Sequence, residues 1–272
     1  MQHPKYLLEK YGLFPKKSLG QNFIYDDFVL AKIAEAAEIT PHDELLEIGP
    51  GLGALTQHLA QAARRVVAVE LDGRFIPILQ EQLTDYTNIE LVQGDILDLE
   101  PADYFQQDYK VVANVPYYIT GAILRHLLSG PYKPTMMVLT VQQEVAERLM
   151  AEPGNLSLLA VSVQFYGRVE IVEKIKAGAF WPRPDVDSAV IRISLYDDRV
   201  VSPDEETAFF RLVKAGFSQK RKQLQKNLRM LEGNRGKVRQ LLQSAGVDGT
   251  RRAETLTLEE WAAVFRAFND AK

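Results

Sequence analysis

The stretch Glu44-Leu-Leu-Glu-Ile-Gly-Pro-Gly-Leu-Gly53 decides the fold, because it joins a short apolar run to a glycine-rich turn. The run 44–48 is typical of a buried strand. The glycines after it let the backbone turn sharply and approach a ligand closely. Apolar residues with helical spacing follow over 55–63. A strand, a glycine turn and a helix in this order indicate the first unit of a parallel α/β sheet.

The segments around this turn alternate between strand-like and helix-like patterns. We expect strands at 44–48, 65–69, 89–92, 109–113 and 136–141, and helices at 28–37, 55–63, 75–83 and 142–150. Such alternation predicts a mostly parallel sheet covered by helices, with ligands bound beyond the carboxyl ends of the strands. One candidate residue follows each of the first four strands: Gly49, Glu70, Asp95 and Asn114.

The last third of the chain has a different pattern. The β-rich runs 158–165 and 188–195 are expected to pair as late antiparallel strands, and 197–206, with Asp, Ser and Pro, is expected to be a linker. From Thr207 onward only helical periodicity remains. The sequence therefore predicts two domains, an α/β domain over 1–199 and a small all-α domain over 200–272.

Composition excludes several classes of protein. The chain has 46% hydrophobic and 25% charged residues and no cysteine, which excludes disulfides, thiolate metal sites and cysteine nucleophiles. The four histidines have no ligand spacing, so we expect no metal site. Neither a signal peptide nor an apolar run of membrane-spanning length is recognisable, which favours a cytoplasmic protein.

The charge is unevenly distributed along the chain. Residues 1–199 carry 18 Lys and Arg against 27 Asp and Glu, whereas residues 200–272 carry 14 against 9. Ten basic residues fall within 211–239, among them Lys220, Arg221 and Lys222. A basic cluster on an acidic protein is typical of phosphate binding, so these three residues are candidates for contact with nucleic acid. A solvated helical face is the alternative.

The glycine turn is compatible with two classes of cofactor. Read with Ala54, it matches the dinucleotide pattern G-x-G-x-x-A, and Glu70 follows after about 20 residues, where a ribose-binding acid belongs. Pro50 lacks the N–H that a pyrophosphate would use, which favours a nucleoside without phosphates. Glu70 would then accept hydrogen bonds from ribose hydroxyls and Asp95 from an adenine amine, and acids here also suit a cationic sulfonium.

The stretch Asn114-Val-Pro-Tyr-Tyr118 directly follows the fourth strand and suggests the reaction. The Asn114 side-chain oxygen and the next backbone carbonyl, held by Pro116, would position the exocyclic amine of a flipped adenine. Tyr117 or Tyr118 would supply an aromatic face. A turn followed by core tyrosines is the alternative. Beside the glycine turn and two acids, methylation of the adenine amine is favoured.

The sequence resembles the ribosomal RNA adenine dimethyltransferase family, and within it the bacterial small-subunit enzymes. The resemblance is carried, in order along nearly the whole chain, by residues 18–23, 47–56, 69–72, 94–95, 114–118, 143–149, 180–190, 215–222 and 227–228. It implies a Rossmann-like class I methyltransferase fold with a seven-stranded sheet, and a small all-α C-terminal domain. It also implies S-adenosyl-L-methionine as the cofactor.

The resemblance further assigns roles to residues of this chain. The N-terminal segment 1–25 would close over the cofactor. Asn114, Pro116 and Tyr117 would hold the target amine, and Phe180 would stack on the target base. The cofactor-binding residues would be Gln21, Asn22, Ile24, Gly49, Gly51, Glu70, Asp95 and Asn114. The substrate would be two adjacent adenosines near the 3′ end of 16S rRNA, in the 30S subunit or its precursor, and a monomer is expected.

Three other functions are compatible with these motifs. A related enzyme that modifies one adenine of 23S rRNA has the same Asn-x-Pro-Tyr chemistry, but 50–53 and 187–190 are closer to the 16S enzyme. DNA adenine methyltransferases usually carry a second proline where this chain has Val115, together with a separate DNA-reading domain. A non-catalytic assembly or transcription factor would not need an intact Asn114 or glycine turn.

Overall fold

The structure is a computed structural model that describes residues 2–271, except for the side chain of residue 235. The chain divides into two compact units. The first unit comprises Met1–Ala146 and Arg168–Leu195, and the second comprises Glu147–Gly167 and Tyr196–Lys272. The second unit thus joins residues before the last strand to the C-terminal helices. The predicted domain boundary after residue 199 stays a prediction.

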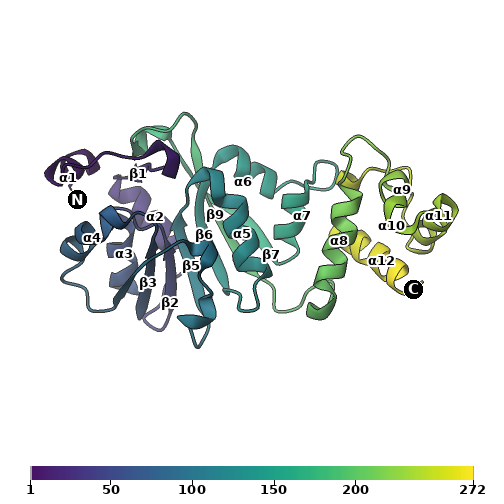
Figure 1. Cartoon of the computed structure of the whole chain (residues 1–272), viewed down its shortest axis with the longest axis horizontal. Helices are drawn as coiled ribbons and strands as arrows, with labels where there is room; N and C mark the ends of the chain where they lie inside the picture. The colour runs from purple at the N-terminus through teal and green to yellow at the C-terminus, as the bar shows by residue number, and fades with distance from the viewer. Residues whose placement is uncertain (1, 272) are drawn as a thin grey trace. The chain divides into compact units, whose positions relative to one another are not determined.

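A seven-stranded sheet forms the centre of the first unit (Figure 1). Its strand order is β4-β3-β2-β5-β6-β9-β7. The pairs β4–β3, β3–β2, β2–β5 and β5–β6 are parallel, and β6–β9 is antiparallel. The predicted mostly parallel α/β sheet is therefore confirmed. The strands are β2 (Glu44–Ile48), β3 (Arg65–Glu70), β4 (Ile89–Gln93), β5 (Tyr109–Asn114), β6 (Met136–Gln142), β7 (Gly167–Ile175) and β9 (Ser188–Leu195).

Helices pack on the sheet through apolar side chains and lie on both of its faces (Figure 1). Leu30, Ile33 and Leu59 from α2 and α3 share one buried cluster with Val66 and Val112 of the sheet. The burial of each such side chain contributes about 1.5–3 kcal/mol to folding. The helices of this part of the chain are α1 (Pro4–Lys10), α2 (Asp27–Ala36), α3 (Ala54–Ala62), α4 (Ile76–Gln82), α5 (Thr120–Ser129) and α6 (Gln143–Leu149).

The N-terminal residues are anchored to the first unit at two places. Leu7 and Leu8 of α1 pack in a buried cluster with Phe75 and Leu79, which brings α1 against α4. Further along, β1 (Phe23–Ile24) pairs antiparallel with β8 (Phe180–Trp181). The segment between these anchors, which includes residues 14–22, contains only one turn of 3-10 helix, Lys17–Leu19.

The prediction of a strand over 158–165 was wrong, because these residues form helix α7 (Leu158–Gln164). The Ser157 hydroxyl accepts a hydrogen bond from the backbone N–H of Ala160, and such an N-cap stabilises a helix start by about 1 kcal/mol. Val161 and Val163, which favoured a strand in the sequence, are buried in the helix. The strand beside β9 is instead β7.

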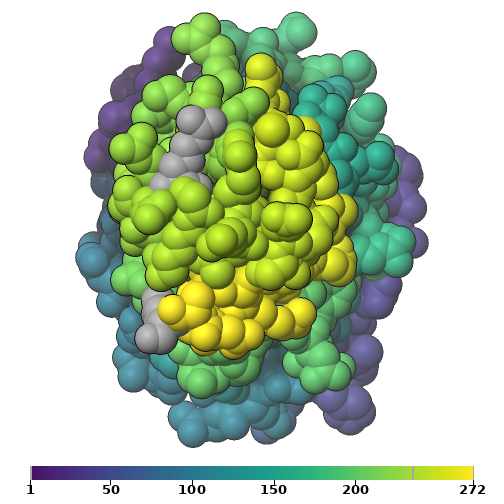
Figure 2. Space-filling view, turned by 90° about the vertical axis from the view of Figure 1, so that its right-hand side faces the viewer, coloured from purple at the N-terminus to yellow at the C-terminus, as the bar shows by residue number. Residues whose placement is uncertain are grey.

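Within the described residues, the regular elements after β9 are all helices, as the helical periodicity from Thr207 onward predicted. Figure 2 turns this part toward the viewer, in green to yellow. Trp261 is fully buried, and the rings of Phe165 and Phe209 stack with centroids 5.0 Å apart. The helices are α8 (Glu206–Gly216), α9 (Leu224–Asn227), α10 (Arg229–Glu232), α11 (Arg235–Ser244) and α12 (Leu258–Asn269).

The contact between α8 and α12 generates a stability prediction. A Cβ atom on Gly216 would overlap the buried ring of Trp261, so Gly216→Ala should lower the free energy of unfolding by about 1–3 kcal/mol. Gly121→Ala is the matched control, since a Cβ there meets no atom within 4 Å, and it should be neutral or stabilising by up to ~1 kcal/mol. Urea denaturation of both variants checks this. Equal stabilities would contradict the tight helix contact.

Candidate active site

The carboxyl ends of four neighbouring parallel strands form one side of a cleft in the first unit. The chain enters the sheet at β2 and builds outward in both directions, so β2 and β5 flank a topological switch point, where α/β proteins bind ligands. The cleft brings together all eight residues predicted to bind the cofactor, and Pro116 with them. Its lining includes Gln21, Asn22, Ile24, Gly49, Gly51, Glu70, Asp95, Asn114 and Pro116.

The glycine turn after β2 has a conformation that other residues rarely adopt. Gly49 and Gly51 have φ angles of 68° and 59°, in the left-handed region. A Cβ on Gly49 would meet no atom within 4 Å, so the absence of a side chain leaves open space at this point. A Cβ on Gly51 would lie 3.1 Å from the ring of Phe23. The turn therefore has both the shape and the clearance for close approach of a ligand.

Glu70 at the end of β3 is held by two backbone donors. Its carboxylate accepts a hydrogen bond from the Gly51 N–H at 2.9 Å and another from the Asp72 N–H at 2.8 Å. Its side chain is buried, and burial raises its pKa although both backbone donors act in the opposite direction. Each oxygen keeps a second lone pair, so the oriented carboxylate can accept further hydrogen bonds from hydroxyls in the cleft.

Glu47 on the neighbouring strand is a site residue to which the sequence assigned no role. It lines the cleft and is 1% exposed. Among the described residues, no group donates a hydrogen bond to its Oε2 atom. Burial raises the pKa of this carboxyl to about 8, and the nearby charge of Glu70 adds to the increase. Two buried carboxyls at the strand ends favour a ligand that brings positive charge and hydrogen-bond donors.

Asn114 at the end of β5 has a fixed side-chain orientation. Its Nδ2 donates to the backbone carbonyl of Asn22 at 3.0 Å. Because a carbonyl oxygen can only accept, this bond assigns the two ends of the amide and leaves Oδ1 as an acceptor. The following residues place Pro116 and the 59% exposed ring of Tyr118 along the cleft.

Two of the residues predicted to act on the target base do not line the cleft. The hydroxyl of Tyr117 shares a hydrogen bond with that of Ser188 at 2.7 Å, and burial raises the pKa of Tyr117. Phe180 is 2% exposed and belongs to the buried cluster that α2 and α3 form with the sheet. Of the two tyrosines considered for the aromatic face, the structure brings Tyr118 to the cleft. The roles of Tyr117 and Phe180 stay predictions.

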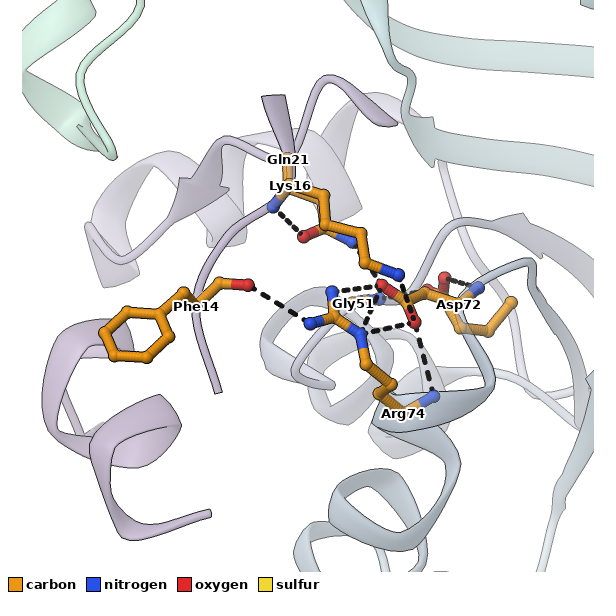
Figure 3. A network of polar contacts seen from close by, with 7 residues as sticks. Phe14, Lys16, Gln21, Gly51, Asp72 and Arg74 are labelled. Carbon is orange, nitrogen blue, oxygen red and sulfur yellow. Dashed lines mark hydrogen bonds and ion pairs between the residues drawn. The ribbon is translucent and has the colours of Figure 1, made fainter. Parts of the chain in front are cut away.

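The N-terminal segment reaches the same cleft through Gln21, Asn22 and Ile24. The side-chain amide of Gln21 is engaged at both ends, since its Oε1 accepts from the Lys16 N–H at 2.7 Å and its Nε2 donates to Asp72 at 2.9 Å (Figure 3). Asp95 lies across the cleft, and its carboxylate accepts from the Leu97 N–H at 2.9 Å. Strand ends and N-terminal segment together surround the cleft.

The three basic candidates belong to the second unit and lie in the turn between α8 and α9. Lys220, Arg221 and Lys222 are exposed, and among the described residues none of them pairs with an acid. No group of three or more His, Asp or Glu side chains in the described part of the chain could hold a metal ion. No helix among these residues has the length and apolarity to cross a membrane.

Glu47 generates a prediction on pH and stability. Its pKa is about 8 in the folded protein and near 4.5 in an unfolded chain, so between these pH values the folded state binds more protons than the unfolded state. Stability contributed by neutral Glu47 is therefore lost as the pH rises from about 5 to about 8. Glu47→Gln should remove this loss and be more stable than the wild type at pH 8, on the order of a few kcal/mol.

Urea denaturation at several pH values measures this difference. Glu44→Gln is the matched control on the same strand, because Glu44 accepts from Arg65 at 3.2 Å and its replacement removes an ion pair. This control should show no gain that grows with pH. A Glu47→Gln effect that is constant from pH 5 to pH 8 would contradict a neutral buried carboxyl.

Comparison with known proteins agrees with the family resemblance found in the sequence. The family model described as "Ribosomal RNA adenine dimethylase" matches residues 14–270. Proteins named "Ribosomal RNA small subunit methyltransferase A" are 44% identical over 264 residues in Dehalococcoides mccartyi strain CBDB1 and 43% over 277 residues in Geobacillus kaustophilus. These alignments cover 96% and 97% of this chain, and 91% and 94% of the relatives.

Solved structures are similar over most of the chain. The 23S rRNA methyltransferase ErmE has a TM-score of 0.73 and 31% identity, covering 91% of this chain and 99% of that one. A dimethyladenosine transferase from Plasmodium falciparum has a TM-score of 0.80 and 26% identity, covering 91% and 98%. The Rossmann-like class I methyltransferase fold is confirmed, and the chain belongs to the ribosomal RNA adenine dimethylase family.

Proposed function

We propose that this protein transfers methyl groups from S-adenosyl-L-methionine to the N6 amines of two adjacent adenosines near the 3′ end of 16S rRNA. The fixed amide of Asn114 carries the proposal, because its Oδ1 is left to accept a hydrogen bond in the cleft that Asn114 lines. The choice of 16S over 23S rRNA rests on relatives named for the small subunit, at 42–44% identity, against 31% for ErmE.

The residues of the cleft fit this cofactor. Gly49 and Gly51 leave room for close approach, Glu70 can accept from ribose hydroxyls, and Asp95 can accept from the adenine amine. The Oε2 of Glu47 has no hydrogen-bond partner among the described residues, and a cationic ligand would favour the ionised form of this carboxyl. When bound, the cofactor supplies an electrophilic methyl group on a positively charged sulfur. Gln21, Asn22 and Ile24 would cover it from the N-terminal segment.

The chain's own contribution to the reaction is positioning of the target amine. The Oδ1 of Asn114 and the backbone carbonyl of Val115 would accept the two amine hydrogens and draw the nitrogen toward tetrahedral geometry. In this geometry the lone pair is less delocalised into the ring and faces the methyl group. The transfer needs no strong base, since the nitrogen loses its proton to water after it has been alkylated.

The target base must leave the RNA stack to reach this site. We assign the aromatic surface for it to Tyr118, which lines the cleft. The resemblance implies Phe180 on the other side, and its buried ring would have to be uncovered to stack on the base. We assign phosphate contacts to Lys220, Arg221 and Lys222, which are exposed and carry no acidic partner in the described structure. A monomer that acts on the 30S subunit or its precursor in the cytoplasm completes the proposal.

Transfer of labelled methyl groups to 30S subunits that lack adenine dimethylation tests the proposal, with the modified nucleosides then identified. Dimethyladenosine at two adjacent 16S positions is the expected result. Label that enters only 23S rRNA would replace the substrate but keep the chemistry. No transfer by a protein that still binds 30S subunits would overturn the enzymatic function.

Two substitutions should separate the roles of Asn114 and Glu70. Asn114→Ala removes the acceptor for the amine and should lower the transfer rate by about 10²–10³-fold, while cofactor binding stays measurable. Glu70→Ala should weaken cofactor binding by about 2 kcal/mol, because buried ribose hydroxyls would lose a charged acceptor. Calorimetry with the cofactor and single-turnover transfer measure the two effects. Normal turnover of Asn114→Ala would contradict its assigned role.

Replacement of Lys220, Arg221 and Lys222 together by alanine should weaken binding to 30S subunits. Each lost phosphate contact should reduce the slope of log K against log salt by about 0.7–0.9. Lys5, Arg64 and Lys174 are exposed and remove the same charge when replaced, so their triple variant is the control. If both triple variants have the wild-type slope, the basic turn is a solvated surface.

A further inference from the structure

Asp72 is a buried carboxylate outside the predicted set of site residues. It lies two residues beyond the end of β3 and is 5% exposed. Arg74 donates to it from Nε at 2.9 Å and from Nη2 at 2.6 Å. These hydrogen bonds to Arg74 hold the pKa of Asp72 at about 2, so the carboxylate is charged at neutral pH.

This carboxylate and its arginine hold the N-terminal segment (Figure 3). Gln21 Nε2 donates to Asp72 at 2.9 Å, the Lys16 ammonium lies 3.9 Å from the same carboxylate, and Arg74 donates to the Phe14 carbonyl at 3.4 Å. Apart from the bond between Gly20 and the adjoining Asn22, the hydrogen bonds and ion pairs of the described residues that join 14–21 to the rest of the molecule end on Asp72 or Arg74. We call this set of contacts the Asp72 latch.

The latch lies one residue away from the hydrogen bond that orients the amide of Asn114. Gln21 is followed directly by Asn22, whose carbonyl accepts from Asn114 Nδ2 at 3.0 Å. The side chain of Asn22 donates to Gly20 at 3.2 Å, which stiffens the same turn. A displacement of Gln21 would therefore carry the Asn22 carbonyl with it and release the amide of Asn114.

Asp72 also contacts the cofactor side of the cleft, but through its backbone. Its N–H donates to Glu70 Oε1 at 2.8 Å, and this bond does not depend on the side chain. Loss of the Asp72 carboxylate would therefore leave Glu70 oriented while the N-terminal segment is released. The two effects can be separated by experiment.

We infer that Asp72 is a positioning residue for methyl transfer, which acts through Gln21 and Asn22 on the amide of Asn114. The inference rests on the proposed function, because it assigns Asp72 to the reaction in which Asn114 holds the target amine. Asp72→Asn keeps the size of the side chain but places an NH₂ group among the donors of Gln21 and Arg74. Residues 14–21 should then lose their contacts with residue 72.

The expected signature is a fall in kcat that exceeds the rise in KM for the cofactor. Asp72→Asn should lower kcat by about tenfold, since a small misplacement of a catalytic group has effects of this size or larger. KM for S-adenosyl-L-methionine should rise by a smaller factor than kcat falls, because Glu70 keeps both backbone donors while the cover formed by the N-terminal segment is loosened. Hydrogen exchange of the amides in 14–22 should become faster.

Gln21→Ala provides the second variant. It opens the latch from the other side and leaves Asp72 paired with Arg74, so it avoids a buried unpaired charge. It should reproduce the fall in kcat at an unchanged melting temperature. If covering the cofactor is the whole role of Gln21, its replacement should raise KM and leave kcat unchanged.

Glu81→Gln is the control for general loosening of the N-terminal region. Glu81 on α4 accepts from Lys10 of α1 at 2.5 Å, and both side chains are about half exposed. Its replacement removes an ion pair between the N-terminal region and α4 without touching the latch. We expect wild-type kcat, wild-type KM and wild-type exchange in 14–22.

The outcomes separate the inference from the proposed function. An active wild type whose kcat is unchanged in both Asp72→Asn and Gln21→Ala overturns the inference alone, as does a rise in KM without a fall in kcat. An equal loss in Glu81→Gln also overturns it, because any loosening would then suffice. A wild type that transfers no methyl group to any RNA overturns the proposed function and the inference with it.

Discussion

The site depends on the register of four parallel strands. Ile48 of β2 pairs with Val69 of β3 and with Ala113 of β5, so the residues that follow these three positions lie at one level of the sheet. Side chains alternate between the two faces of a strand. A slip of one residue in either pair would therefore turn Glu70 or Asn114 away from the cleft. Apolar side chains at most central positions, matched to both faces, prevent such a slip.

The strand register brings together groups whose burial or backbone conformation is unfavourable for folding. Glu47 and Glu70 bring two carboxyls into the interior, and the glycine turn between them has left-handed backbone angles. Burial raises the pKa of both carboxyls, which shows that the folded protein holds their charged forms poorly. The packed clusters of the first unit offset this cost. A ligand that supplies hydroxyls and a positive charge would meet acceptors that are already in place.

Much of this arrangement could be predicted from the sequence because it follows from local patterns. The strand periodicity and the residues after each strand located Gly49, Glu70, Asp95 and Asn114, and the structure brings all four to one cleft. Helix α7 was missed because its valines favour a strand locally. The Ser157 cap and burial of the helix outweigh that preference.

Other features depend on contacts between residues far apart in the chain. Tyr117 and Tyr118 are neighbours with the same chemistry, and they are distinguished by the bond from Tyr117 to Ser188, which lies 71 residues away in the chain. The role of Asp72 could not be predicted from the sequence either, because its main partner from the N-terminal segment, Gln21, stands 51 residues earlier. The spacing of residues in the sequence cannot predict a contact between two residues this far apart.

The polar residues at the strand ends are all held by hydrogen bonds with backbone groups. Glu70 is held by the N–H groups of Gly51 and Asp72, Asn114 by the carbonyl of Asn22, and Asp95 by the N–H of Leu97. Backbone groups are present whatever the side chain, so these four hydrogen bonds depend on the path of the chain more than on the identity of the partner residues. The path itself must then be fixed by other means. Strand pairing fixes it within the sheet, whereas over 14–22 the fixing groups are side chains, and the carboxylate of Asp72 is the one on which they converge.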